Sequence, residues 1–310
     1  MEIRKDYILE RYVFIASERK KRPKEFKKDE KQEKGICFFC PGNENLTPPE
    51  IGRIKKGNSW SIRWFPNKFP VVEKNKKFNL KKEKYFTSSP AYGMHEVIAE
   101  TPDHEKQLWD LSSDHIKQLI DVCKSRIKAL EKLKNIKYVQ IFKNHGREAG
   151  TSLIHSHTQV VALPMIPSLI KEEVEAIKGY KTCPYCDIIK IESKSKRKCF
   201  ENKDFVAIAP FGSRFNYECW IFPKRHIRRL DELTDKETKN LAEILNKVLK
   251  KLKKINMSYN YFIHSSPKGE NLHLHIEITP RSAVWAGFEF STDMIINSVS
   301  PEDAAEFYMA

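Results

Sequence analysis

Two segments of the chain carry apolar residues three and four positions apart, which is the spacing of one face of an α-helix. The first segment carries Ile116, Leu119, Ile120, Cys123 and Ile127, and the second carries Leu241, Ile244, Leu245, Val248 and Leu252. Ser112 and Thr234 stand shortly before these two stripes, and Ser and Thr are favoured helix N-caps. The pattern predicts two amphipathic helices that begin near these caps.

Each predicted helix leads to the same succession of segments. A strand-like segment follows, at residues 137–144 in one case and 260–265 in the other. A loop then leads to a second strand-like segment that contains two histidines separated by one residue, at 154–162 and 272–279. The chain therefore repeats a strand–helix–strand unit.

The repeat also includes the segments before the two helices. A C-x-x-C pair and a β-rich stretch precede each copy, and aligning His104 with His226 makes the neighbouring leucines and the caps coincide. Coincidence of several patterns at nearly equal spacing indicates an internal duplication. We expect an N-terminal half over residues 1–165 and a C-terminal half over residues 180–310.

The composition is that of a folded protein with a sizeable core, since 40% of the 310 residues are hydrophobic and 31% are charged. The N-terminus has no apolar region typical of a signal peptide, and no apolar run is long enough to span a bilayer. We therefore expect a cytoplasmic protein without a membrane partner. The formal net charge of +15 comes mostly from scattered lysines, which indicates a solvated surface and no nucleic-acid partner.

Four of the seven cysteines form the two C-x-x-C pairs, and each pair is accompanied by two histidines at matching places in its half. The first set is Cys37, Cys40, His104 and His155, and the second set is Cys183, Cys186, His226 and His273. Zinc takes four such ligands in a tetrahedron. The sequence predicts two zinc ions per chain, each joining segments that are distant in the sequence. A zinc-stabilised nucleic-acid-binding protein stays open as the non-enzyme alternative.

The first H-x-H segment places His155, His157 and Gln159 on one face of a strand, because strand side chains alternate between faces. His155 is assigned to the first zinc set. His157 is then free for chemistry, and a neutral imidazole is a competent nucleophile near pH 7.

Several motifs resemble the galactose-1-phosphate uridylyltransferase family, a two-copy branch of the histidine-triad superfamily. They are "SERKKRP", "CFFCPGNE", "FPNKFP", "TPDH", "NHGREAGTSLIHSHTQ" and "SVSPEDAAEFY". The resemblance runs along almost the whole chain. It implies an α+β class with a duplicated histidine-triad-like fold, in which each half has an antiparallel sheet and packed helices. It also implies a homodimer, in which the C-terminal segment of one chain closes the pocket of the other.

The resemblance further implies exchange of a UMP group between UDP-glucose and a hexose 1-phosphate such as galactose 1-phosphate. His157 would form a covalent uridylyl-histidine, and Gln159 would donate an amide N–H to a phosphoryl oxygen. The remaining substrate-binding residues that it implies are Arg19, Arg22, Phe38, Asn67, Asn144, Gly150, Thr151 and Ser152.

The sequence departs from the family pattern at three places. Ser156 and Thr158 replace the Pro and Gly of the usual H-P-H-G-Q motif, on the strand face opposite His157. Lys68 stands where many members have Asp. The residues that hold the sugar phosphate find no counterpart near the C-terminus. An ADP-sugar phosphorylase or adenylyltransferase with the same histidine chemistry is therefore the alternative enzyme.

The second H-x-H segment has Glu277 where the first has Gln159, so we expect the C-terminal half to keep the fold without the nucleophile. Some family members have an iron site in this half. His264, His273 and His275 are accordingly an alternative metal cluster, and the second metal could be iron.

Overall fold

Ten strands form one antiparallel sheet in the computed structural model, which describes residues 2–15 and 36–310. From one edge to the other the order is β10-β11-β12-β14-β13-β8-β9-β7-β4-β3. In chain order the strands are β3 (Gly52–Lys56), β4 (Ser59–Pro66), β7 (Met94–Ala99), β8 (Tyr138–His145), β9 (His157–Leu163), β10 (Lys198–Glu201), β11 (Phe205–Ile208), β12 (Cys219–Pro223), β13 (Tyr259–His264) and β14 (His275–Pro280).

The strand order is symmetric about the centre of this sheet. β8 of the first half pairs antiparallel with β13 of the second half, with Phe142 opposite Phe262. Moving outward from this pair, β9 corresponds to β14, β7 to β12, β4 to β11 and β3 to β10. This order is the one that an internal duplication produces when the two copies join edge to edge.

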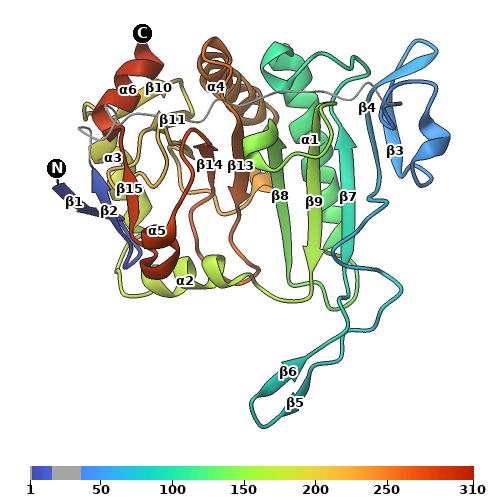
Figure 1. Ribbon diagram of the computed structural model, residues 1–310, viewed down its shortest axis with the longest axis horizontal. Helices are drawn as coiled ribbons and strands as arrows, with labels where there is room; N and C mark the ends of the chain where they lie inside the picture. Colours follow the sequence, from blue (N-terminus) through green and yellow to red (C-terminus); the bar gives the residue numbers. More distant parts are fainter. Residues whose placement is uncertain (1, 16–35) are drawn as a thin grey trace.

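Helices α1 (Ser113–Leu130) and α4 (Asp235–Lys254) cover one face of the sheet and pack against each other (Figure 1). Their apolar stripes are buried as predicted, and both caps are present. The Ser112 hydroxyl accepts the His115 N–H at 3.2 Å, and the Thr234 hydroxyl accepts the Glu237 N–H at 3.3 Å. These features confirm the predicted α+β class, with an antiparallel sheet and packed helices in each half.

The apolar core on this helical face determines which face of the sheet carries the polar side chains of β9. Val160 and Ala162 of β9 pack in the same cluster as the apolar residues of α1. Because strand side chains alternate, His157 and Gln159 of the same strand project from the opposite face. The sheet thus presents the H-x-H residues on the side that the two long helices leave uncovered.

Smaller elements surround the sheet. They are the strands β1 (Glu2–Lys5), β2 (Tyr12–Ile15), β5 (Lys81–Glu83), β6 (Phe86–Ser88) and β15 (Ile295–Asn297), and the helices α2 (Ser168–Ile177), α3 (Pro184–Glu192), α5 (Gly287–Thr292) and α6 (Pro301–Met309). β1 and β2 form a three-stranded sheet with β15, so the N-terminal strands lie against the C-terminal half (Figure 1). The β5–β6 hairpin projects from the body of the molecule (Figure 1). Among the described helices, none combines the length and the apolar character needed to cross a bilayer.

Candidate active site and metal clusters

The first predicted metal set comes together in the structure. The ligand atoms of Cys37, Cys40, His104 and His155 lie within 4.8 Å of one another. Cys37 Sγ is 3.5 Å from His155 Nδ1, and Cys40 Sγ is 3.4 Å from His104 Nδ1. His155 Nε2 donates its proton to the Thr101 carbonyl at 2.7 Å. In the neutral ring this bond leaves the lone pair on Nδ1, which lies toward the thiols, as a metal-ligating imidazole requires. The set fits a tetrahedral zinc ion.

The second set has the same construction. The ligand atoms of Cys183, Cys186, His226 and His273 also lie within 4.8 Å of one another. His273 Nε2 donates to the Pro223 carbonyl at 2.9 Å, and His226 Nε2 lies 3.0 Å from the Asn271 side-chain oxygen. Both imidazoles thus turn Nδ1 toward the cysteines, and this set also has the donor atoms that suit zinc.

His157 begins β9 and is oriented by the strand itself. Its Nδ1–H donates to the His155 carbonyl at 2.8 Å, so that Nε2 keeps the lone pair. The ring packs edge-on against Phe39, with ring centroids 5.4 Å apart. Burial, together with the nearby charge of Lys143, lowers the pKa of His157 to about 4. The imidazole is therefore neutral near pH 7, as a nitrogen nucleophile must be.

A buried ion pair lies against this strand on the face opposite His157. Lys143 on β8 and Glu100 after β7 are 1% and 0% exposed, and Lys143 Nζ lies 3.0 and 2.9 Å from the two carboxylate oxygens. Ser156 and Thr158 donate their hydroxyls to Glu100 at 2.5 and 2.6 Å. Lys143 also donates to the His157 carbonyl at 3.1 Å. The two hydroxyl residues that depart from the family motif are thus the partners of a buried carboxylate.

The loop between β8 and β9 passes close to the C-terminal half. Gly146 has a φ of +82°, and a Cβ there would lie 2.1 Å from the Ser258 hydroxyl, so a larger residue cannot replace it without a shift. Gly150 is also left-handed, with a φ of +79°. Thr151 and Ser152 follow it and line a cavity beside His157. Glycine at both positions thus suits the left-handed backbone of the loop, and at Gly146 it also permits the close contact with Ser258.

Two cavities meet at His157. The smaller, of about 240 Å³, is lined by aromatic side chains and by three of the predicted substrate residues, Phe38, Asn67 and Ser152. The larger, of about 580 Å³, lies between the halves and is lined by the loop residues and by Arg147 and Arg281. His157 and Ser152 line both cavities.

The other predicted substrate residues have different positions. Gln159 lines the smaller cavity beside His157. Asn144 lines the larger cavity, and its side-chain oxygen accepts the Asn260 amide from β13 at 2.8 Å. Arg19 and Arg22 lie outside the described residues.

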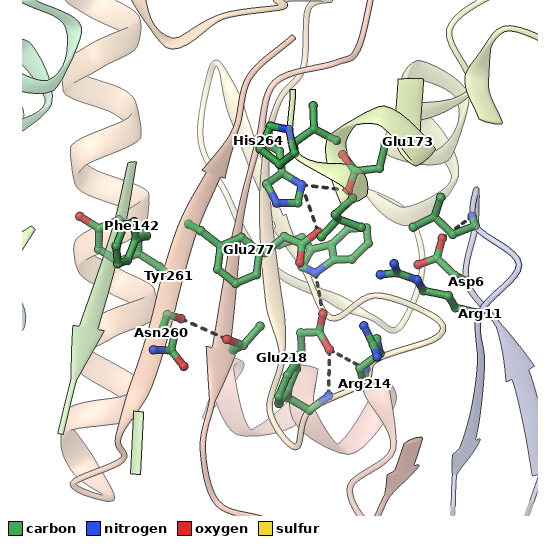
Figure 2. A pocket seen from close by; sticks show the side chains of 18 of the residues that line it. Asp6, Arg11, Phe142, Glu173, Arg214, Glu218, Asn260, Tyr261, His264 and Glu277 are labelled. Carbon is green, nitrogen blue, oxygen red and sulfur yellow. Dashed lines mark hydrogen bonds and ion pairs between the residues drawn. The ribbon is translucent and has the colours of Figure 1, made fainter. Parts of the chain in front are cut away.

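A third cluster lies in the C-terminal half, and it regroups the histidines that the sequence offered as an alternative metal site. His264 and His275 meet Glu173 of α2 and Glu277, with their ligand atoms within 4.8 Å of one another. His273 lies with the cysteines of the second set instead. Figure 2 shows the carboxylates of Glu173 and Glu277 facing His264, whose Nδ1 is 2.9 Å from Glu173 and 3.7 Å from Glu277. The sequence did not indicate the two carboxylates.

The chemistry of the third cluster suits a cation. Glu173, His264 and His275 are buried and Glu277 is 12% exposed, and Glu173 Oε2 has no hydrogen-bond partner among the described residues. Burial disfavours a charged His264, but the two carboxylates outweigh this effect and raise its pKa to about 9. A divalent metal ion would replace that proton, and two imidazoles with carboxylates are ligands that iron accepts.

Two family models and two curated relatives match this chain. The family model "Galactose-1-phosphate uridyl transferase, N-terminal domain" matches residues 2–167, and the model of a domain of unknown function matches residues 93–309. ADP-glucose phosphorylase of Arabidopsis thaliana is 33% identical, over 98% of this chain and 91% of the relative. Galactose-1-phosphate uridylyltransferase of Thermotoga maritima is 30% identical, over 98% of this chain and 96% of the relative.

Solved structures show the same similarity. The crystal structure of the A. thaliana ADP-glucose phosphorylase with bound ADP-glucose has a TM-score of 0.86 and 30% identity, over 99% of this chain and 98% of that chain. A structure described as a uridylyltransferase has a TM-score of 0.78 and 31% identity, over 100% of this chain and 97% of that chain.

Proposed function

The chain belongs to the galactose-1-phosphate uridyl transferase family, and we propose that it exchanges a UMP group between UDP-glucose and a hexose 1-phosphate through His157. The observation that carries this proposal is the position of His157 where two cavities meet. The smaller cavity, with Phe38, would hold the nucleoside. The larger one, with Thr151 and Ser152, would hold the phosphate of the leaving or entering sugar.

The chemistry is a double displacement. The lone pair of His157 Nε2 forms a P–N bond to the α-phosphorus of UDP-glucose, and the P–O bond to glucose 1-phosphate breaks. A phosphate oxygen of hexose 1-phosphate then attacks the same phosphorus and releases the imidazole. The leaving group is a phosphate, so no strong general acid is required. The main requirement is stabilisation of charge on the phosphoryl oxygens, for which Gln159 and the loop amides are the donors.

Phosphorolysis of ADP-glucose is the second candidate. It uses the same nucleotidyl-histidine, with inorganic phosphate in place of the hexose 1-phosphate as acceptor. The high similarity to a phosphorylase along nearly the whole chain favours it.

One experiment tests both candidates. The protein is mixed with UDP-, ADP- and GDP-sugars, and intact-protein mass spectrometry detects the covalent nucleotidyl group. An adduct with UDP-glucose that hexose 1-phosphate removes supports the first candidate, and an adduct with ADP-glucose that inorganic phosphate removes supports the second. Absence of an adduct with every sugar nucleotide, in metal-replete protein, would contradict the proposed chemistry.

We also propose that the two cysteine-containing sets bind zinc and tie the segments of each half together. Elemental analysis should find two zinc ions per chain. Cys37→Ser and Cys183→Ser should each remove about one ion and lower the thermal midpoint, because each removes one of four ligands. Cys123→Ser is the matched control: Cys123 is buried on α1 and belongs to none of the metal clusters of the described residues, so this variant should keep both ions. A metal-replete preparation that lacks zinc would contradict the assignment.

The third cluster, formed by Glu173, His264, His275 and Glu277, is the candidate site for iron. If it holds iron, the metal analysis should show iron in addition to the two zinc ions. Glu173→Gln should then remove the iron and leave the zinc unchanged, since Glu173 does not belong to the two zinc sets.

Finally, we propose a homodimer in which the segment around α5 covers the partner's pocket. Val284 and Phe290 in this segment are 87% and 74% exposed, which supports an apolar contact with another chain. Light scattering at micromolar concentration should give the mass of two chains. Val284→Asp should weaken the dimer and lower activity together. A fully active monomer would refute the shared pocket.

A further inference from the structure

His95 is buried directly beside Gln159. It lies on β7, which pairs with β9 so that Val97 is opposite Gln159 and His95 is opposite Val161. His95 and Val97 are two residues apart and therefore project from the same face of the sheet as Gln159. The His95 side chain is 5% exposed, so its ring nitrogens interact with neighbouring protein groups.

The neighbours of His95 determine which ring nitrogen carries the proton. The backbone N–H of Val71 lies 3.3 Å from His95 Nδ1, and a backbone N–H can only donate. Nδ1 must therefore present its lone pair. Burial lowers the pKa of His95, so the ring is neutral and its one proton is on Nε2. That proton is donated to Gln159 Oε1, which lies 2.9 Å from Nε2.

Asn67 is consistent with this tautomer. Its side-chain oxygen accepts the Phe69 N–H at 2.8 Å, so its amide nitrogen is the atom that lies 3.2 Å from His95 Nε2. An amide NH₂ nitrogen and a protonated ring nitrogen both only donate, so these two atoms do not form a hydrogen bond with each other. Gln159 is therefore the acceptor for His95, and the Asn67 amide keeps its protons for other partners.

The hydrogen bond from His95 decides which way the Gln159 amide faces. Without a partner, a glutamine amide can turn by half a rotation and exchange its oxygen for its nitrogen. The oxygen would then face a phosphoryl oxygen and repel it. With Oε1 held by His95, the NH₂ group of Gln159 is directed away from His95 and can donate to the charge that develops in the transition state.

We propose that His95 is a positioning residue that fixes the Gln159 amide with its nitrogen toward the reacting phosphoryl group. The inference rests on the proposed function, because it gives Gln159 its role through the nucleotidyl transfer to His157. It adds a residue of β7 to the groups that assist that step.

The test compares two replacements of similar length. His95→Met removes both ring nitrogens, whereas His95→Gln can place an amide N–H near the former Nε2. The rate of adduct formation is measured in single turnovers, with whichever sugar nucleotide labels the wild type. His95→Met should slow the step about tenfold, as expected for loss of one hydrogen bond to the catalytic amide. His95→Gln should recover most of the rate. The concentration of sugar nucleotide that gives half the maximal rate should change much less than the rate itself.

A double-mutant cycle separates positioning from a general packing effect. Gln159→Ala alone should slow the step about 10²-fold. If His95 acts through Gln159, adding His95→Met to Gln159→Ala should cost little more, because the amide that His95 holds is already absent. Independent effects would instead multiply to about 10³-fold.

The possible outcomes are distinct. Rate losses that multiply in the double variant, or a wild-type rate in His95→Met, would overturn the positioning role. The adduct in the wild type would still support the proposed function. Equal losses in His95→Met and His95→Gln, with a lowered thermal midpoint in both, would show that His95 only supports the fold. Absence of an adduct in the wild type would instead contradict the proposed function itself.

Discussion

Replacement of His157 by Ala should abolish the nucleotidyl adduct and both half reactions, with a loss of at least about 10⁴-fold. The reason is that His157 Nε2 is the nucleophile that the strand directs to the meeting point of the two cavities. The fold should persist, because His157 belongs to none of the metal clusters of the described chain. Intact-protein mass spectrometry and a thermal midpoint measure the two effects on the same sample.

His155→Ala is the matched control, since it removes a histidine from the same face two residues earlier. Its Nδ1 faces Cys37 and Cys40, so this variant should lose metal and stability as well as activity. His157→Gly gives a further test, because its cavity could admit a nucleotidyl-imidazolide that brings its own activated ring. Transfer from that compound to a sugar phosphate would show that only the imidazole was missing. An adduct that persists in His157→Ala, or maps to His145, His264 or His275, would disprove the mechanism.

Much of the fold was predictable because the duplication repeats local patterns. The stripes and caps of α1 and α4 need only the 3.6-residue period and a Ser or Thr before it. The two cysteine-containing clusters were predictable for the same reason, since each ligand type recurs in the same order in both halves. Periodicity and repetition are properties of the sequence alone, so no contact had to be known in advance.

Other features depend on contacts between distant segments and gave no local signal. Glu173 lies on α2, about a hundred residues from His275, and only the fold brings the two side chains together. The local sequence does not distinguish His95 from other polar residues in strands. Only the pairing of β7 with β9 places it beside Gln159. The pairing of β2 with β15 likewise joins an N-terminal strand to a C-terminal one.

Ser156 and Thr158 show how a departure from a motif can be explained by structure. The sequence predicts that both lie on the strand face opposite His157. The structure shows that both donate to buried Glu100, which in turn binds Lys143. The strand that carries the nucleophile is thus held by a charged network whose members lie on β8, on β9 and in the segments just after β7 and just before β9.

Lys143→Met should be among the most destabilising single changes, at about 3–5 kcal/mol. Burial alone would raise the pKa of Glu100, but the charge of Lys143 and the two hydroxyls outweigh it and hold the pKa below its usual value. Removal of Lys143 leaves a carboxylate that is 0% exposed without a counter-charge. Chemical unfolding at pH 7.5 should show the loss. Lys190→Met is the control, because the Lys190–Asp187 pair is 76% and 57% exposed and should contribute less than about 1 kcal/mol.

The pH dependence of this loss has a definite sign. In the wild type the lowered pKa of Glu100 stabilises the fold above the pKa of the unfolded carboxyl, and this stabilisation disappears as the pH falls. In Lys143→Met the buried carboxyl has a raised pKa, so the penalty is present at neutral pH and disappears once the carboxyl is protonated. The difference between the two proteins should therefore shrink from pH 7.5 to pH 5.

A second variant distinguishes loss of the charge balance from loss of packing. Lys143→Met combined with Glu100→Gln removes both charges of this buried pair, and it should recover much of the stability. The double variant should still label more slowly than the wild type, because the Lys143 N–H no longer holds the His157 carbonyl. If Lys143→Met were no more destabilising than Lys190→Met, the buried pair would not support the strand. Recovery of stability without recovery of the labelling rate would show that this ion pair both stabilises the fold and positions the nucleophile.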